Sequence, residues 1–184
     1  MVIAPAHHRR IQAGILSWGQ DLDHEHNPFQ CNLGYQVSLS GKGEWAKKGD
    51  YIGKQALEKM KADLKDGHKP YKLQLVGFEI GGKPIDEYAP DFWLVSPGDG
   101  GDPCGFITSP WYHPEKGKNI AMGYIPFDGT LNPNGFPKWE LGKKFKVHLP
   151  DIYADEPGVP VDAVTVDVPF TESFNANTRE VVKG

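Results

Sequence analysis

Residues 159–168, VPVDAVTVDV, alternate almost perfectly, with valine out of phase with aspartate or threonine. A period of two residues places successive side chains on opposite faces and predicts a β-strand. Five more short apolar segments, each bounded by turn residues, indicate strands at residues 72–80, 92–96, 104–108, 119–125 and 144–149. Six short strands separated by turns predict a small antiparallel barrel or sandwich, and Gly77 is a candidate bulge in the first of them.

The composition agrees with a turn-rich β protein. Of 184 residues, 22 are glycine and 16 are proline, and 11% are aromatic. Glycine and proline at this level exclude a helix bundle, because both weaken the interior of a helix. The aromatic and aliphatic content is sufficient for a buried core, which excludes a disordered chain.

One segment has the spacing of an amphipathic helix. It begins near Gly53, and its apolar residues recur every three or four positions with charged residues between them. Asp50 is placed to cap the N-terminus, and Gly67 to take a left-handed conformation after the last turn. Residues 68–70, His-Lys-Pro, then end the helix and mark the best internal boundary. The apolar positions are Ala56, Leu57, Met60 and Leu64.

The first fifty residues contain no comparable helical pattern. Residues 10–18, RIQAGILSW, alternate weakly and predict a strand or an extended segment. Residues 33–39, LGYQVSL, predict a second strand, and residues 40–49, rich in glycine and lysine, predict a loop.

Charge and hydropathy exclude several classes of partner. The formal net charge of −4 and the scattered basic residues give no footprint for nucleic acid. No apolar run approaches the length of a membrane-spanning helix, and the first ten residues lack the apolar core of a signal peptide. We therefore expect a cytoplasmic protein. Cys31 and Cys104 belong to no metal-binding pair and are expected to be free thiols in a reducing compartment, the alternative being a disulfide between them.

Polar clusters near the N-terminus offer candidate chemistry, each with a simpler interpretation beside it. Residues 21–26, DLDHEH, contain metal-ligating side chains, but the spacing of His24 and His26 fits a hydrated loop better, and no metal site is predicted. Residues 7–10, HHRR, could hold an anion, although an exposed N-terminal arm is favoured. A Cys–His nucleophile pair finds no support in the spacing of the two cysteines.

Residues 105–126 contain the densest combination of aromatic and polar side chains. Trp111, Tyr112 and His113 follow one strand segment, and a Lys-Gly-Lys-Asn sequence leads into the next. A loop with aromatic rings and hydrogen-bond donors can line a ligand pocket. The same aromatic residues could instead plug the barrel, and the residues alone do not decide between the two.

Several motifs together resemble the aminomethyltransferase (glycine-cleavage T-protein) family, whose members transfer one-carbon units to or from tetrahydrofolate. Residues 10–23, RIQAGILSWGQDLD, are similar to a family segment that starts with arginine and carries a glutamate where this chain has Gln12. Further similar segments follow in family order. They are residues 27–35, residues 50–57 (DYIGKQAL), residues 105–125 with their Thr-Ser and Ala-Met-Gly-Tyr sequences, and residues 168–170 (VPF).

The resemblance implies an α+β, mainly β chain that corresponds to the C-terminal half of such an enzyme. Residues 1–69 would form the end of a folate-binding α+β domain, residues 70–170 a six-stranded antiparallel β-barrel, and residues 171–184 a surface tail. The half that carries the catalytic residue in the family would be the partner of this chain. No catalytic residue is therefore assigned within it.

The resemblance also implies a function and a cofactor. The chain would contribute to transfer of a methyl or aminomethyl group from a small-molecule donor to tetrahydrofolate, and its sequence is closer to the demethylase branch of the family. Arg10 would face the folate, with the indole of Trp18 nearby and residues 111–113 closing over it. The implied cofactor-binding residues are Arg10, Trp18, Trp111, Tyr112 and His113; Phe174 is a looser candidate. The alternatives are a non-catalytic folate-binding or accessory module of the same fold family, and a barrel with a new ligand.

Overall fold

The computed structural model describes residues 7–39 and 50–170, which form two compact units. The first unit contains residues 7–23, 75–125 and 140–170, and the second contains residues 24–39, 50–74 and 126–139. Both units are therefore built from segments distant in sequence. The chain changes from one unit to the other after residues 23, 74, 125 and 139, and not at a single boundary near residue 70. The predicted surface tail, residues 171–184, and the predicted loop, residues 40–49, lie outside the described residues.

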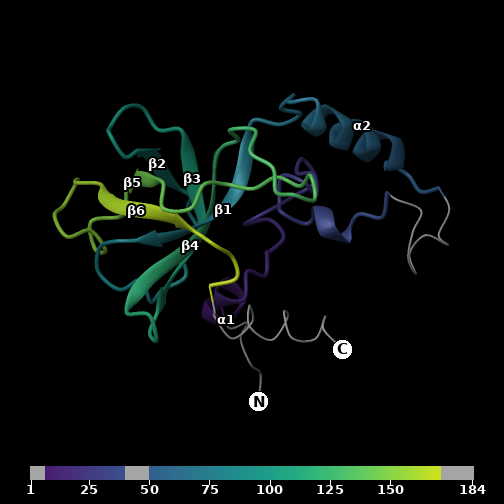
Figure 1. The fold of residues 1–184 in the computed structure, drawn as a ribbon. Helices are drawn as coiled ribbons and strands as arrows, with labels where there is room; N and C mark the ends of the chain where they lie inside the picture. The colour runs from purple at the N-terminus through teal and green to yellow at the C-terminus, as the bar shows by residue number, and fades with distance from the viewer. Residues whose placement is uncertain (1–6, 40–49, 171–184) are drawn as a thin grey trace, which may run out of the picture. The chain divides into compact units, whose positions relative to one another are not determined.

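The first unit is a closed β-barrel (Figure 1). Six strands of the described chain close in the order β1-β4-β3-β2-β5-β6, and neighbouring strands run antiparallel wherever their register is defined. The predicted barrel is therefore confirmed. The strands are β1 (Leu73–Ile80), β2 (Trp93–Pro97), β3 (Gly105–His113), β4 (Lys118–Pro126), β5 (Lys144–Val147) and β6 (Val161–Val166).

The six strands coincide with the six predicted segments, but one of them is much longer. β3 continues to His113, so Trp111, Tyr112 and His113 lie within a β-hairpin with β4 and not in a loop between strands. The alternation of β6 is also less simple than its valines suggest. Its buried positions are Val161, Ala163 and Thr165. The Thr165 hydroxyl is satisfied there because it donates to the Glu140 carbonyl at 2.5 Å.

The structure shows no bulge at Gly77 in the pairing with β6. The register between β1 and β6 runs from Gly77 to Ile80 without interruption, and the irregularity lies in β3 between Ile107 and Ser109. Glycine is required at position 77 for a different reason. A Cβ atom there would lie 2.5 Å from Cγ2 of Val168 and 3.0 Å from the Val166 carbonyl oxygen, so the chain after β6 can pack only against a bare backbone.

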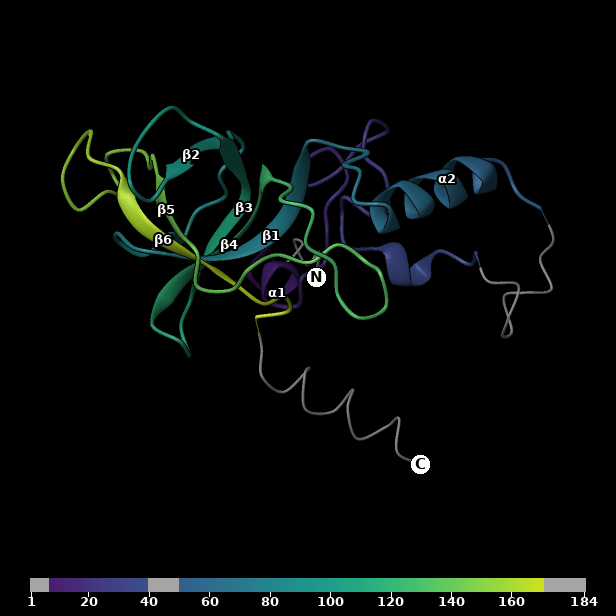
Figure 2. The ribbon, with the colours of Figure 1, turned by 45° about the horizontal axis from the view of Figure 1, so that its top comes forward.

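Two predictions for the N-terminal region are corrected by the structure. Residues 7–12 form a short helix, α1 (His7–Gln12), which packs against β3, so the predicted strand over residues 10–18 is wrong (Figure 2). The predicted strand over residues 33–39 contains instead a single 3₁₀ turn, η1 (Gly34–Gln36). Gly34 packs against Phe29 and Phe136, where a Cβ atom would come within 3 Å of either ring.

The second unit is organised by helix α2 (Lys54–Lys65), which begins one residue after Gly53 as predicted. Asp50 does not cap it: the cap residue is Gly53, and the Asp50 carboxylate accepts a hydrogen bond from Lys54 at 3.0 Å. The other end is closed as expected by Gly67 at φ +81°. There the amide of Gly67 donates to the Leu64 carbonyl and that of His68 to the Asp63 carbonyl, which is a Schellman motif.

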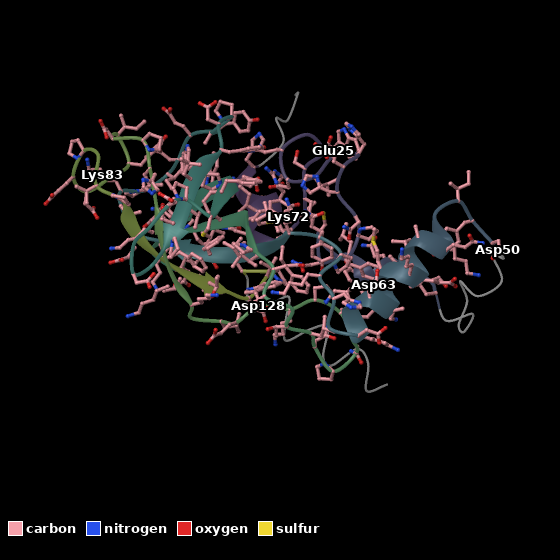
Figure 3. The ribbon with its side chains drawn as sticks, turned by 90° about the horizontal axis from the view of Figure 1, so that it is seen from above. Glu25, Asp50, Asp63, Lys72, Lys83 and Asp128 are labelled. Atoms are coloured by element: carbon pink, nitrogen blue, oxygen red, sulfur yellow. The ribbon has the colours of Figure 1, made fainter. Side chains whose placement is uncertain are left out.

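The core of the second unit is small. Phe29, Leu64 and Phe127 are its buried members. In Figure 3, Asp50 labels the segment just before α2, and Asp63 labels the last turn of that helix. The apolar side chains packed around this centre are Leu39, Leu57, Met60, Tyr71, Leu131 and Phe136. Cys31 and Cys104 are not joined by a disulfide, as expected. Over the described residues, no helix is long and apolar enough to cross a bilayer.

Candidate functional site

A buried carboxylate organises the polar interior of the first unit. The side chain of Asp21 is completely shielded from solvent. Its Oδ1 accepts hydrogen bonds from the hydroxyls of Thr108 at 2.6 Å and Ser109 at 2.5 Å, and its Oδ2 accepts one from the Ser17 amide at 2.8 Å. Arg10 completes the set with an ion pair at 2.7 Å. Four donors on one carboxylate compensate the cost of removing its charge from water.

The Arg10 guanidinium is held almost entirely by protein groups. Besides Asp21, Nη1 donates to the Ile15 carbonyl at 3.2 Å. Nη2 donates to Gln20 Oε1 at 3.1 Å and to Ser109 Oγ at 2.8 Å. Only 14% of the side chain is exposed, and Nε is buried with no hydrogen-bond partner among the described residues. The fork geometry of arginine here joins α1, the loop of residues 15–22 and β3.

Three further hydrogen bonds fix the same loop to the barrel. Gln20 donates from Nε2 to the Thr108 carbonyl at 2.7 Å and to the Ala89 carbonyl at 3.2 Å. The Tyr124 hydroxyl, from β4, donates to the Asp21 carbonyl at 2.7 Å. The Arg10–Asp21 cluster, by which we mean Arg10, Ser17, Gln20, Asp21, Thr108, Ser109 and Tyr124, thus links four chain segments through buried polar contacts.

Two of the predicted cofactor residues, Trp111 and His113, lie on the face of β3 that carries Ser109 of this cluster. Beyond the bulge the strand is regular, so Ser109, Trp111 and His113 share a face and Tyr112 points to the other. Trp111 contacts α1, with its ring centroid 6.3 Å from that of His7. His113 is buried, and within the described chain neither of its ring nitrogens has a hydrogen-bond partner.

Trp18, which is also a predicted cofactor residue, lies outside β3. It occupies the loop of residues 15–22, where it forms a bridge with Leu22, and it is 69% exposed. The loop that carries it is nevertheless held in place, because the Asp21 carboxylate binds the Ser17 amide and Arg10, and Gln20 donates to the Thr108 carbonyl. Trp18 is therefore an exposed indole on an anchored segment.

The structure changes the interpretation of both polar clusters near the N-terminus. The exposed arm favoured for residues 7–10 is wrong, since they form α1 and Arg10 is mostly buried. The hydrated-loop interpretation of residues 21–26 fails for Asp21, which is buried. Among the described residues, no group of three or more His, Cys, Asp or Glu side chains is arranged to hold a metal ion.

Sequence reasoning did not identify the partners of Asp21. In the sequence, Thr108 and Ser109 are only a Thr-Ser pair within a family motif, and no pattern singles out Gln20. The available signal was indirect. A Thr-Ser pair inside an otherwise apolar strand needs buried hydrogen-bond partners, and an unpaired arginine and aspartate in one short segment could supply them.

Comparison with known proteins finds similarity to aminomethyltransferases. No protein-family model matches the chain. It is 32% identical over 117 residues to an aminomethyltransferase of Synechocystis sp., covering 64% of this chain and 27% of that protein. It is 29% identical over 162 residues to an aminomethyltransferase of Thermosynechococcus vestitus, covering 88% of this chain and 35% of that protein.

A solved structure has the same fold. The glycine cleavage system aminomethyltransferase T from Bartonella henselae superposes with a TM-score of 0.60 at 20% identity, over 89% of this chain and 37% of that one. The chain thus spans about a quarter to a third of the length of the curated relatives that it matches. Over the segment that it spans, the chain is similar in sequence to aminomethyltransferases and has the fold of the solved one.

Proposed function

We propose that the chain works together with the part of an aminomethyltransferase that it does not span, in the tetrahydrofolate-dependent transfer of a methyl or aminomethyl group from a small-molecule donor. The observation that carries this proposal is the match to aminomethyltransferases over up to 88% of the chain. Within this proposal, the resemblance favours the demethylase branch of the family, and the glycine-cleavage branch is the alternative.

The Arg10–Asp21 cluster supports the proposal from the structural side. Residues 10–23 carry the resemblance to the family, and in the fold they hold the cluster's Arg10, Ser17, Gln20 and Asp21. The Thr-Ser sequence of a second motif supplies its partners on β3. Two motifs that are almost ninety residues apart therefore meet in one buried network, which is a physical reason for them to occur together.

The residues on the cluster's side of β3 suit the cofactor chemically. Tetrahydrofolate has a flat, hydrogen-bonding ring system, and Trp111 offers an aromatic face beside it. His113 offers two ring nitrogens that no described residue occupies. We infer that Trp111 and His113 would hold the cofactor, and that Tyr112 contributes from the opposite face of the strand. When bound, tetrahydrofolate would supply the nitrogen that accepts the one-carbon group.

Arg10 has a different role in this proposal from the one that the resemblance implies. Its two terminal nitrogens are engaged by Asp21, Ile15, Gln20 and Ser109, so it is a positioning residue that fixes β3 and the adjoining loop. Trp18 is not included among the cofactor contacts, because its indole lies on that loop and is mostly exposed.

A titration tests the proposal. The chain is titrated with tetrahydrofolate by calorimetry, alone and after mixing with the unmatched part of the Thermosynechococcus vestitus aminomethyltransferase. We expect binding in the mixture that weakens about tenfold or more in Trp111→Ala, equivalent to losing one ring-stacking contact. Absence of binding in both samples would overturn the one-carbon function. Binding without transfer of a one-carbon group would favour the accessory folate-binding module instead.

A further inference from the structure

A tight turn in the second unit contains an asparagine followed by a glycine. Residues 131–137 read LNPNGFP, and the amide of Gly135 donates to the Asn132 carbonyl at 2.8 Å, which closes a β-turn. Proline at the second position of the turn and glycine at the fourth are residues that such turns favour. Asn134 occupies the third position and is exposed, so water reaches its side-chain amide.

The glycine after Asn134 removes the usual steric barrier to an intramolecular reaction. A backbone nitrogen can attack the side-chain carbonyl carbon of the asparagine before it, which expels ammonia and closes a cyclic succinimide. A Cβ atom on the attacking residue hinders this approach, and Gly135 has none. Gly135 also lies at φ +74°, a conformation that glycine adopts without strain. Hydrolysis of the succinimide by water then gives either aspartate or isoaspartate.

Asn132 controls how readily the attacking nitrogen becomes available. The bond from the Gly135 amide to the Asn132 carbonyl must break before this nitrogen can lose its proton and approach the Asn134 side chain. The Asn132 side chain stabilises the closed turn, because its Oδ1 accepts from the amides of Asn134 at 2.9 Å and Phe136 at 3.1 Å. Turns at the surface open locally without global unfolding. The turn therefore slows the reaction and does not prevent it.

We propose that Asn134 is a site of spontaneous deamidation, with water as the second reactant, and that the hydrogen bonds of Asn132 set its rate in the folded chain. The products affect the second unit because the turn places Phe136. The Phe136 ring lies 6.4 Å from that of the buried Phe29, and Lys61 Nζ lies 4.9 Å from the Phe136 centroid. Isoaspartate adds one backbone atom inside the turn, so the bonds between Asn132 and Phe136 lose their register. Aspartate adds only a charge.

Peptide mapping by mass spectrometry tests the modification site. The full chain is incubated at mildly alkaline pH, and conversion of the side-chain amide at Asn134 to a carboxyl group is followed with time. We expect conversion at Asn134, and a rate about tenfold higher in Asn132→Ala, equivalent to about 1.4 kcal/mol of turn stability. The unmodified chain in urea should also react faster, which gives the same readout if Asn132→Ala does not fold.

Two controls accompany this measurement. Asn134→Gln is the matched control, because it keeps a side-chain amide but must form a larger ring, so it should stay unconverted. Asn32 is the internal comparison in the same digest, since the residue after it is leucine, and it should react much more slowly. Absence of conversion at Asn134 in the folded chain, or equal conversion at Asn32, overturns the modification site. A rate at Asn134 that neither Asn132→Ala nor urea raises overturns the control by the turn.

Urea denaturation tests the consequence for Phe136. The isoaspartate form is separated from the incubated chain and compared with Asn134→Asp, which carries the same charge on an unaltered backbone. We expect the isoaspartate form to unfold at a lower urea concentration, because its turn no longer holds Phe136 over Phe29. Equal midpoints for the two forms would show that the turn does not support this packing, and would overturn that part of the inference.

Discussion

Replacing Asp21 by asparagine should destabilise the first unit strongly, although the two side chains have almost the same shape. Asparagine can keep one oxygen toward the Ser17 amide and Arg10, at the positions now 2.8 and 2.7 Å from the carboxylate. Its amide group would then face the Thr108 and Ser109 hydroxyls, which can rotate to accept hydrogen bonds. What the substitution removes is therefore mainly the negative charge.

The magnitude follows from the burial of Arg10. Its side chain is 14% exposed, so the guanidinium would be left without a counterion and largely without water. Removing one partner of a buried ion pair costs about 3–5 kcal/mol. Arg10 keeps its bonds to Ile15, Gln20 and Ser109, which places the expected loss near the lower end, at about 3 kcal/mol. For a chain of this length that corresponds to a fall in Tm of roughly 6–12 °C.

Urea denaturation followed by tryptophan fluorescence measures the effect, with Asp162→Asn as the control. Asp162 pairs with Lys146 at the same distance, 2.7 Å, but its side chain is 87% exposed. The Lys146 ammonium lowers the pKa of the Asp162 carboxyl, yet solvent screens that interaction, so the control should unfold like the unmodified chain. Equal midpoints for the two variants would refute the claim that burial of the Arg10–Asp21 pair supports this unit.

Three further predictions concern single positions. Tyr71→Phe should leave the second unit equally or about 1 kcal/mol more stable at pH 7, because the Tyr71 hydroxyl is buried without a hydrogen-bond partner in the described chain. Burial, with a smaller contribution from the nearby Cys31, raises the pKa of Tyr71. The free energy of unfolding is therefore unaffected by this group below about pH 10 and falls as the pH rises further. Denaturation at about pH 7 and about pH 10.5 should show a smaller alkaline loss of stability in the variant than in the unmodified chain. Gly77→Ala should cost about 2 kcal/mol in urea denaturation through its clash with Val168, and a Gly77→Ala/Val168→Ala pair that recovers nothing would contradict this explanation. His113→Leu should raise Tm by a few degrees, since it removes two unpartnered buried nitrogens, and should weaken tetrahydrofolate binding in calorimetry; a lower Tm would mean that the imidazole has partners.

The barrel could be predicted from the sequence because its strands are local patterns. Each is a short apolar segment between turn residues, and closure follows from the need to satisfy the edges of the sheet. The N-terminal region could not be predicted in this way. Residues 10–18 alternate weakly, but α1 forms there because its side chains pack on β3, which lies about a hundred residues later in the chain. Tertiary contacts of this range leave no periodic signal in the segment itself.

The candidate site also depends on contacts between distant residues, which the sequence does not reveal. A sequence of alternating acids and histidines predicts a hydrated loop, because charged residues are usually exposed. Asp21 is buried instead, since Thr108 and Ser109 provide hydroxyls from 87 and 88 positions away. The guanidinium of Arg10 suggests a contact to a ligand, because a guanidinium binds any carboxylate within reach. The same property lets Arg10 bind the carboxylate of Asp21 inside the unit. The motif shared with the aminomethyltransferases is thus explained by the folding of this unit before any ligand is considered.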